Sequence, residues 1–201
     1  MKRKKRTLIC GANVINENQN QPLDLLIEGD FIASIGKHLE SIPVDLKIDA
    51  TGQYLMPGLI DDQVHFREPG LTHKGEIYTE SMAAVSGGVT SFMEMPNTKP
   101  PTLTLEAIEK KVAIAKKKSL ANFAFHLGSS KDNINEIAKI DPTKICGVKA
   151  FLASSTGNML IQDEKTLHKL FKTCPTILSA HCEHEPTIQA NLKKYQQKYK
   201  N

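Results

Sequence analysis

The fold is decided by the run Pro57-Gly-Leu-Ile-Asp-Asp-Gln-Val-His-Phe-Arg-Glu-Pro-Gly70. Its apolar start predicts a buried strand, along which side chains alternate between the two faces of a sheet. The polar side chains that this alternation places on one face are Asp61, Gln63, His65 and Arg67. Polar groups are costly inside a core, because each one needs a partner. We therefore expect this strand end to form part of a functional site.

From Tyr54 onward the chain alternates between strand and helix patterns. Strands are expected at 59–66, 89–95, 120–126, 145–152 and 176–182. Helices are expected at 76–86, 104–118 and 131–139, after the predicted N-cap Asp163, and from Pro186. In the second helix the residues expected to be buried are Leu105, Ile108, Val112 and Ala115. Such alternation implies a parallel sheet, either doubly wound or closed into a (β/α)₈ barrel.

Polar residues at strand ends favour the barrel, because barrel enzymes keep their chemistry at the carboxyl ends of their strands. These residues are His65, Arg67, Asn97, Lys149 and His181. A barrel needs eight strands and about 250 residues, whereas this chain has 201 residues in total. The fold class is therefore α/β, an incomplete (β/α)₈ TIM-type barrel of about five βα units after a small N-terminal β unit.

Two domains follow from this reading. Residues 1–55 are expected to form a small β-sandwich-like unit, with a hairpin at Glu28-Gly29-Asp30, and residues 56–201 the first part of the barrel. We expect the chain to be the front portion of a larger fold. Its open sheet edge would then be covered by a missing C-terminal part or by a homo-oligomer.

Composition narrows the possible functions. The net charge is only +4 and the aromatic content is 5% without Trp, which argues against a nucleic-acid-binding protein. No stretch approaches the 18 apolar residues of a membrane span. The four cysteines lack CxxC spacing, so neither a disulfide framework nor a cysteine zinc site is indicated. They suit a reducing compartment, and we expect a cytoplasmic protein.

The run at 57–70 resembles the opening signature of the amidohydrolase superfamily, and of dihydroorotases in particular, which is usually Asp-x-His-x-His-x-Arg. Further resemblance lies in the runs 83–90, Met95-Pro-Asn-Thr98 and Ser154–Asn158. The resemblance implies hydrolysis of (S)-dihydroorotate to N-carbamoyl-L-aspartate by a metal-bound hydroxide, in pyrimidine synthesis. It implies a small-molecule substrate, and one or two zinc ions as cofactor.

The resemblance also assigns roles to residues. His65 and His181 become zinc ligands at the ends of separate strands, as a catalytic zinc site requires. Lys149 lies mid-strand among apolar residues, where an unpaired lysine is costly, so it needs either a carboxylate partner or chemical conversion. In related enzymes the lysine at this position is carboxylated and bridges two metals, so Lys149 is predicted to be both catalytic residue and ligand. Arg67 and Asn97 would bind the substrate carboxylate.

Two features depart from the pattern. Gln63 stands where the first histidine ligand is usual, and a neutral amide binds zinc far less well than imidazole. The chain also stops before the strands that carry the family's later His and Asp residues. Two alternatives therefore stay open: a non-catalytic dihydroorotase-like partner or scaffold, and a hydantoinase- or allantoinase-type amidohydrolase. The remaining histidines are assigned to surfaces or loops, although His126 ends a strand and could line the site.

Overall fold

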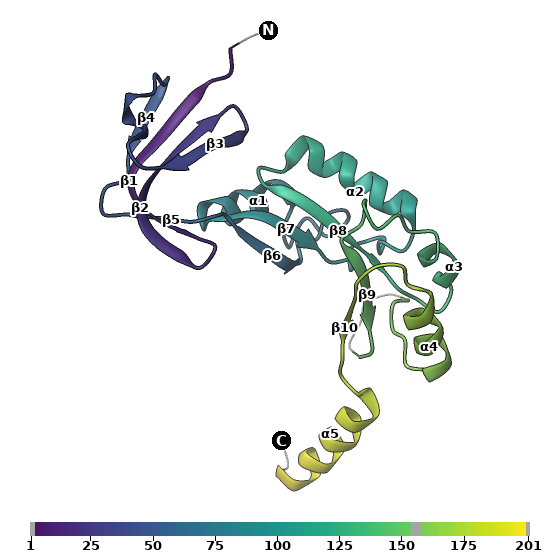
Figure 1. Ribbon diagram of the computed structural model, residues 1–201. Coiled ribbons are helices and arrows are strands. Elements are labelled where there is room, and N and C mark those ends of the chain that lie inside the picture. The colour runs from purple at the N-terminus through teal and green to yellow at the C-terminus, as the bar shows by residue number, and fades with distance from the viewer. Residues whose placement is uncertain (1–2, 154–157, 200–201) are drawn as a thin grey trace. The chain divides into compact units, whose positions relative to one another are not determined.

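The computed structural model describes residues 3–153 and 158–199, and the chain divides into two compact units, Met1–Gly58 and Leu59–Asn201. The predicted Ser154–Asn158 resemblance therefore lies largely outside the described residues. Figure 1 labels the elements of both units. None of the helices in the described part is long and apolar enough to cross a membrane.

The first unit is one five-stranded sheet with the strand order β3-β2-β1-β4, in which β5 also pairs with β1. Its elements are β1 (Arg6–Asn16), β2 (Gln19–Glu28), β3 (Phe31–Gly36), the short 3₁₀ helix η1 (Leu39–Ser41), β4 (Leu46–Asp49) and β5 (Tyr54–Leu55). The turn between β2 and β3 is made by Gly29 at φ +64°, as the hairpin signal predicts. A bulge near Gly11 divides β1, and separate apolar clusters lie on its two halves, around Leu8 and around Val14.

The second unit is a curled parallel sheet with the strand order β10-β9-β8-β7-β6, and it matches part of a TIM-type barrel (Figure 1). Its strands are β6 (Leu59–Val64), β7 (Val89–Glu94), β8 (Asn122–Gly128), β9 (Gly147–Phe151) and β10 (Leu178–His181). Its helices are α1 (Ile77–Ser86), α2 (Leu105–Lys118), α3 (Ile134–Ile137), α4 (Glu164–Thr173) and α5 (Glu185–Tyr199). The predicted five βα units are thus confirmed.

The core of this unit forms between the sheet and its helices. Helices α1 and α2 pack against each other and against β7 and β8, and the buried cluster includes Phe92, Phe125, Ile108 and Leu170. Asp163 caps α4 by accepting a hydrogen bond of 2.8 Å from the backbone N–H of Thr166, which confirms the predicted N-cap.

Three expectations about local structure were wrong. Strand β6 stops at Val64 rather than Phe66, and register shifts interrupt it, so the alternation from Asp61 does not continue to Arg67. Strand β6 is also exposed rather than buried, because it lies at the end of the sheet. Helix α3 has only four residues.

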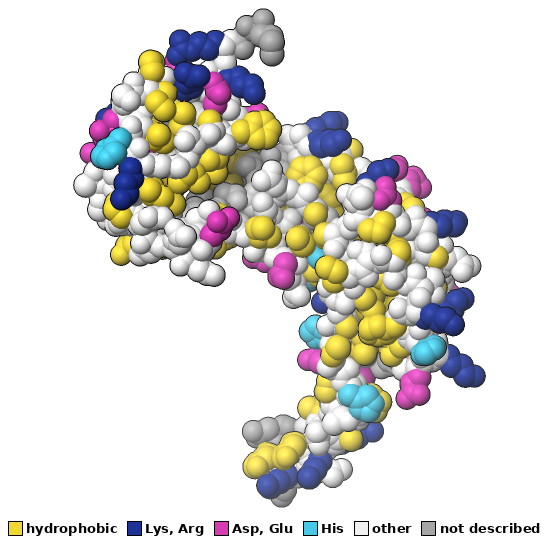
Figure 2. Space-filling view, in the orientation of Figure 1, with side chains coloured by type: hydrophobic (Ala, Val, Ile, Leu, Met, Phe, Trp, Pro, Cys, Tyr) yellow, Lys and Arg dark blue, Asp and Glu magenta, His cyan; other side chains and the backbone are white. Residues whose placement is uncertain are grey.

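Apolar side chains remain exposed at both ends of this sheet. Near β6 they are Leu59, Ile60, Tyr78, Met82 and Val85, and on α5 they are Ile188, Leu192, Tyr195 and Tyr199. Yellow apolar groups are visible between the charged ones on the surface in Figure 2. The predicted apolar stripe of α5 therefore exists, but no residue of α5 is buried among the described residues.

Candidate active site

Two loops at the carboxyl edge of the sheet bring His65 and Asn97 together. Strands β6 and β7 pair at Val64 and Glu94, and the backbone N–H of Met95 donates to Val64 O at 2.9 Å. Just beyond this pairing, His65 Nδ1 lies 2.7 Å from Asn97 Oδ1. An amide oxygen can only accept, so Nδ1 carries the proton and Nε2 keeps its lone pair for a ligand.

The environment of His65 favours a neutral imidazole. Loss of surrounding water lowers the pKa of His65, although part of the ring stays exposed. The hydrogen bond that His65 donates to Asn97 opposes this shift, and the positive charges of Arg67 and Lys149 add to it. A neutral imidazole is the form that binds a metal.

Arg67 follows directly in a strained conformation. Its φ is +66°, in the left-handed region that side chains other than glycine rarely adopt. Its carbonyl accepts a hydrogen bond of 3.1 Å from the backbone N–H of Leu71, which closes a turn. The guanidinium of Arg67 takes part in none of the ion pairs found among the described residues. The fork of Arg67 is thus available to an anion.

Lys149 is buried in the middle of β9, with 4% of its surface exposed. Its ammonium lies 5.4 Å from the centre of the Phe151 ring. Burial lowers the pKa of Lys149, and no carboxylate contributes to the shift. The described residues therefore offer this lysine no anionic partner. Of the two explanations that the sequence left open for a buried lysine, the carboxylate partner is not found among these residues.

His181 ends β10, opposite Phe151 of β9, while Ser179 lies opposite Lys149. The rings of His181 and Phe151 are 6.3 Å apart between centroids. His181 Nε2 lies 3.2 Å from a carboxylate oxygen of Glu183. Because side chains alternate along a strand, His181 and Lys149 share one face of the β9–β10 pair.

Gln63 is exposed, and its backbone N–H donates to Asp61 at 3.0 Å. Within residues 3–153 and 158–199, no three His, Cys, Asp or Glu side chains are gathered as metal ligands would be. The predicted metal ligands include only two histidines, so a further strong ligand would have to come from a modified Lys149. The structure thus brings His65 and Asn97 into contact, and His181 and Lys149 onto one face.

Sequence reasoning missed a buried ion pair next to these loops. Lys111 of α2 and Glu94 of β7 lie 2.7 Å apart, and their side chains are 1% and 0% exposed. Val112, expected in the core, is only partly buried, and Lys111 takes the buried position between Ile108 and Ala115. A charged residue inside the apolar run Phe92–Met95 was the signal that could have revealed the buried carboxylate.

His126 is likewise buried rather than on a surface, with 4% of its area exposed. Its Nδ1 lies 3.4 Å from Cys146 Sγ. Burial lowers the pKa of His126 and raises that of Cys146 to about 11, so both groups are neutral near pH 7. A thiol in this state is not an activated nucleophile.

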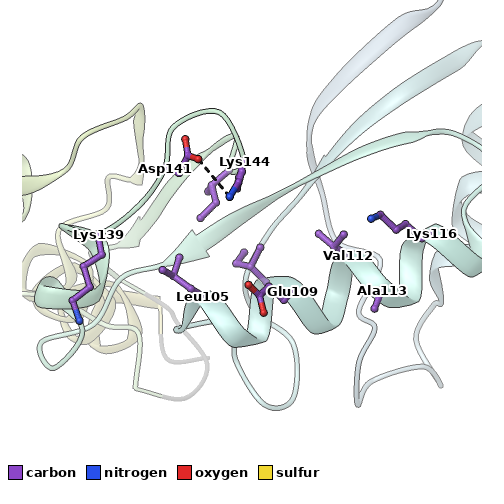
Figure 3. A pocket seen from close by; sticks show the side chains of 10 residues that line it. Leu105, Glu109, Val112, Ala113, Lys116, Lys139, Asp141 and Lys144 are labelled. Carbon is purple, nitrogen blue, oxygen red and sulfur yellow. Dashed lines mark ion pairs between the residues drawn. The ribbon is translucent and has the colours of Figure 1, made fainter.

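A cavity of the second unit lies elsewhere. It has a volume of about 670 Å³ and lies between α2 and the segment from Lys139 to Ile145 (Figure 3). Leu105, Ile108 and Val112 supply apolar lining, and Lys116 and Lys144 lie at its border. None of the predicted site residues lines it, so this groove is separate from the candidate site.

Comparisons with known proteins identify relatives of this chain. A family model described as dihydro-orotase-like matches residues 52–186. The chain is similar to a dihydroorotase of Methanosarcina mazei, at 34% identity over 88% of this chain and 39% of that protein. It is also similar to an allantoinase of Deinococcus radiodurans, at 32% identity over 88% of this chain and 40% of that protein.

Among solved structures, an L-hydantoinase (dihydropyrimidinase) from Arthrobacter aurescens matches with a TM-score of 0.90 and 27% identity. The match covers 98% of this chain and 44% of that one. The chain thus spans about two fifths of the length of the curated relatives that it matches.

Proposed function

Because this chain belongs to the dihydro-orotase-like family of cyclic amidohydrolases, we propose that it takes part in the hydrolysis of dihydroorotate to N-carbamoyl-aspartate. In that reaction water adds to the ring carbonyl, the cyclic C–N bond breaks, and the ring nitrogen takes up a proton. The observation that carries the proposal is the hydrogen bond between His65 and Asn97 at the carboxyl edge of a sheet whose strand β9 carries the buried Lys149 without an anionic partner.

The residues present suit one zinc ion. His65 offers a free Nε2 after β6, His181 ends β10 at the other side of the five-stranded sheet, and a carboxylated Lys149 on β9 would add an anionic oxygen. Zinc bound by these groups would supply a Lewis acid and lower the pKa of water. A second ion would depend on Gln63, whose exposed neutral amide is a weak ligand.

The burial of Lys149 supports its carboxylation. The lowered pKa increases the fraction of neutral amine, which is the form that attacks carbon dioxide. A bond forms between Nζ and the carbon, one proton is released, and the product is an anionic carbamate. The conversion replaces a buried cation that lacks a partner by a ligand whose charge the metal compensates.

Arg67 and Asn97 support a substrate that carries a carboxylate. The guanidinium can bind a carboxylate through two parallel N–H···O bonds. Because Asn97 Oδ1 accepts from His65, its amide NH₂ remains free to donate toward the substrate. Among cyclic amides, dihydroorotate has such a carboxylate, whereas hydantoin and allantoin lack it.

Two other candidates rest on specific observations. A hydantoinase- or allantoinase-type activity is supported by the L-hydantoinase and allantoinase matches. A non-catalytic partner is supported by Gln63 in place of a histidine ligand. The first of these predicts a preference for hydantoin or allantoin over dihydroorotate, and the second predicts no turnover.

The test is a substrate profile of the purified chain after incubation with zinc and bicarbonate. We expect dihydroorotate to be hydrolysed in preference to hydantoin and allantoin. The variant Arg67→Ala should lose that preference through a higher KM for dihydroorotate and leave turnover of hydantoin in place. Preference for hydantoin in the wild type would favour the second candidate, and zinc-loaded chain without any turnover would favour the third.

A further inference from the structure

The Glu94–Lys111 pair lies directly behind the two loops of the candidate site. Glu94 is the last residue of β7, and Lys111 reaches it from α2 over 2.7 Å. Lys111 Nζ also donates to the carbonyl of Met95 at 3.3 Å, and it lies 4.8 Å from the centre of the Phe125 ring. One buried lysine thereby contacts both the side chain of Glu94 and the backbone that leads to Asn97.

Glu94 in turn faces the loop that carries His65. Burial raises the pKa of Glu94, while the charge of Lys111 and the nearby backbone N–H of Arg67 act in the opposite direction. Neither carboxylate oxygen has a hydrogen bond of good geometry among the described residues. The ion pair with Lys111 is therefore the observed contact that compensates the buried charge of Glu94.

The fold by itself does not require charges at these positions. A buried ion pair loses much of its attraction to the cost of removing both charges from water, and an apolar pair of similar volume is often equally stable. In contrast, the left-handed backbone of Arg67 does need support, because this conformation is strained for every residue except glycine.

We propose that the Glu94–Lys111 pair is a positioning device that holds the Met95 carbonyl, lies beside the backbone of Arg67, and so fixes the contact between His65 and Asn97. His65 lies between Val64, which pairs with Glu94, and Arg67. Asn97 follows Met95 by two residues. Both partners of the 2.7 Å contact are thus attached to backbone that the pair holds. The catalytic consequence rests on the proposed function, whereas the positioning of the loops does not.

The decisive variant is the double substitution Glu94→Met with Lys111→Met, which replaces the pair by apolar side chains of similar length. The readouts are the unfolding midpoint and the NMR signals of the Arg67 backbone amide and the Asn97 side-chain amide. Leu170→Ala is the matched control, because Leu170 is fully buried in the same core but lies on α4.

We expect the double variant to fold with a midpoint near that of the wild type, while the Arg67 and Asn97 signals shift or broaden. Leu170→Ala should lower the midpoint and leave those two signals in place. If the preparation hydrolyses dihydroorotate, the double variant should lose roughly 10- to 100-fold in kcat, because small misplacements of reacting groups are costly. Leu170→Ala should keep its kcat at temperatures where it is folded.

Wild-type Arg67 and Asn97 signals in a folded double variant would overturn the proposal. A double variant that fails to fold would also overturn it, because the pair would then serve the fold as a whole. Since the NMR readout needs no turnover, an inactive wild-type chain would count against the proposed function and leave this test intact.

Discussion

His65 and Asn97 come from loops that follow different strands, yet His65 Nδ1 and Asn97 Oδ1 lie 2.7 Å apart. This contact fixes which imidazole nitrogen carries the proton and leaves Nε2 available. It also raises the pKa of His65 against the stronger lowering caused by loss of water. Asn97 therefore controls both the orientation and the charge of the imidazole.

The first prediction concerns Asn97→Ala in the metal-free protein. Removing the hydrogen bond removes the contribution that raises the pKa of His65, so that pKa should fall further below its ordinary value of about 6.5. NMR titration of the His65 ring protons measures it. Asn122→Ala, which removes an exposed amide from the start of β8, is the control. A pKa of His65 that stays constant or rises in Asn97→Ala would contradict the assignment.

The second prediction concerns Gly70, where the backbone approaches the loop that carries Asn97. Gly70 has φ +83°, and an added Cβ would collide with the backbone of Lys99. Gly88 has φ +88° but open space around its Cβ position. Gly88→Ala should therefore lose only the left-handed strain, about 1–2 kcal/mol. Gly70→Ala should lose clearly more stability in chemical denaturation, and equal losses would show that the close approach is unimportant.

The third prediction concerns the start of α1. Glu68 is buried and accepts a hydrogen bond of 3.0 Å from the backbone N–H of Ile77, and it lies 2.7 Å from Lys118. Glu68→Ala removes a cap and leaves that N–H without its acceptor, so it should cost about 1–3 kcal/mol of unfolding free energy. Glu106→Ala, which breaks an exposed pair with Lys110, should leave the unfolding free energy nearly unchanged. Similar losses in both variants would argue against the capping role.

The fourth prediction concerns pH and His126. Burial lowers the folded-state pKa of His126, so the unfolded chain binds more protons below about pH 6.5. This contribution to stability is present above about pH 6.5 and is lost as the pH falls through the lowered folded value. Urea unfolding at about pH 7.5 and about pH 5.5 should therefore show a smaller pH effect in His126→Gln than in the wild type. An equal pH effect would assign the acid sensitivity to other groups.

The strand–helix order could be predicted from sequence because its signals are local. Alternating apolar runs and the capping residue Asp163 each depend on neighbours in the chain. The early end of β6 was not predictable in this way, since it follows from the left-handed Arg67 and from pairing with β7. The same holds for the exposure of Leu59 and Ile60, which depends on the position of β6 in the sheet.

For the site, polar residues after strands pointed to His65 and Asn97, and the structure brings these two into contact because parallel strands finish at one edge. The charged residue in the run Phe92–Met95 could have signalled Glu94 but not its partner Lys111, since a lysine in an amphipathic helix is usually solvated and its burial here depends on that carboxylate 17 residues earlier in the chain. Local sequence patterns do not predict pairs of residues that meet only through tertiary packing.

The central claim is that the carboxyl edge of this sheet holds zinc through His65, His181 and a carboxylated Lys149. The most direct measurement is bound zinc together with a ¹³C NMR signal of a lysine carbamate, after incubation with zinc and ¹³C-bicarbonate. Lys149→Ala and the exposed-lysine control Lys144→Ala are treated alike. We predict bound zinc and a carbamate signal in the wild type and in Lys144→Ala, and neither in Lys149→Ala. Zinc retained in full by Lys149→Ala, or zinc-loaded wild type without a carbamate, would contradict the account.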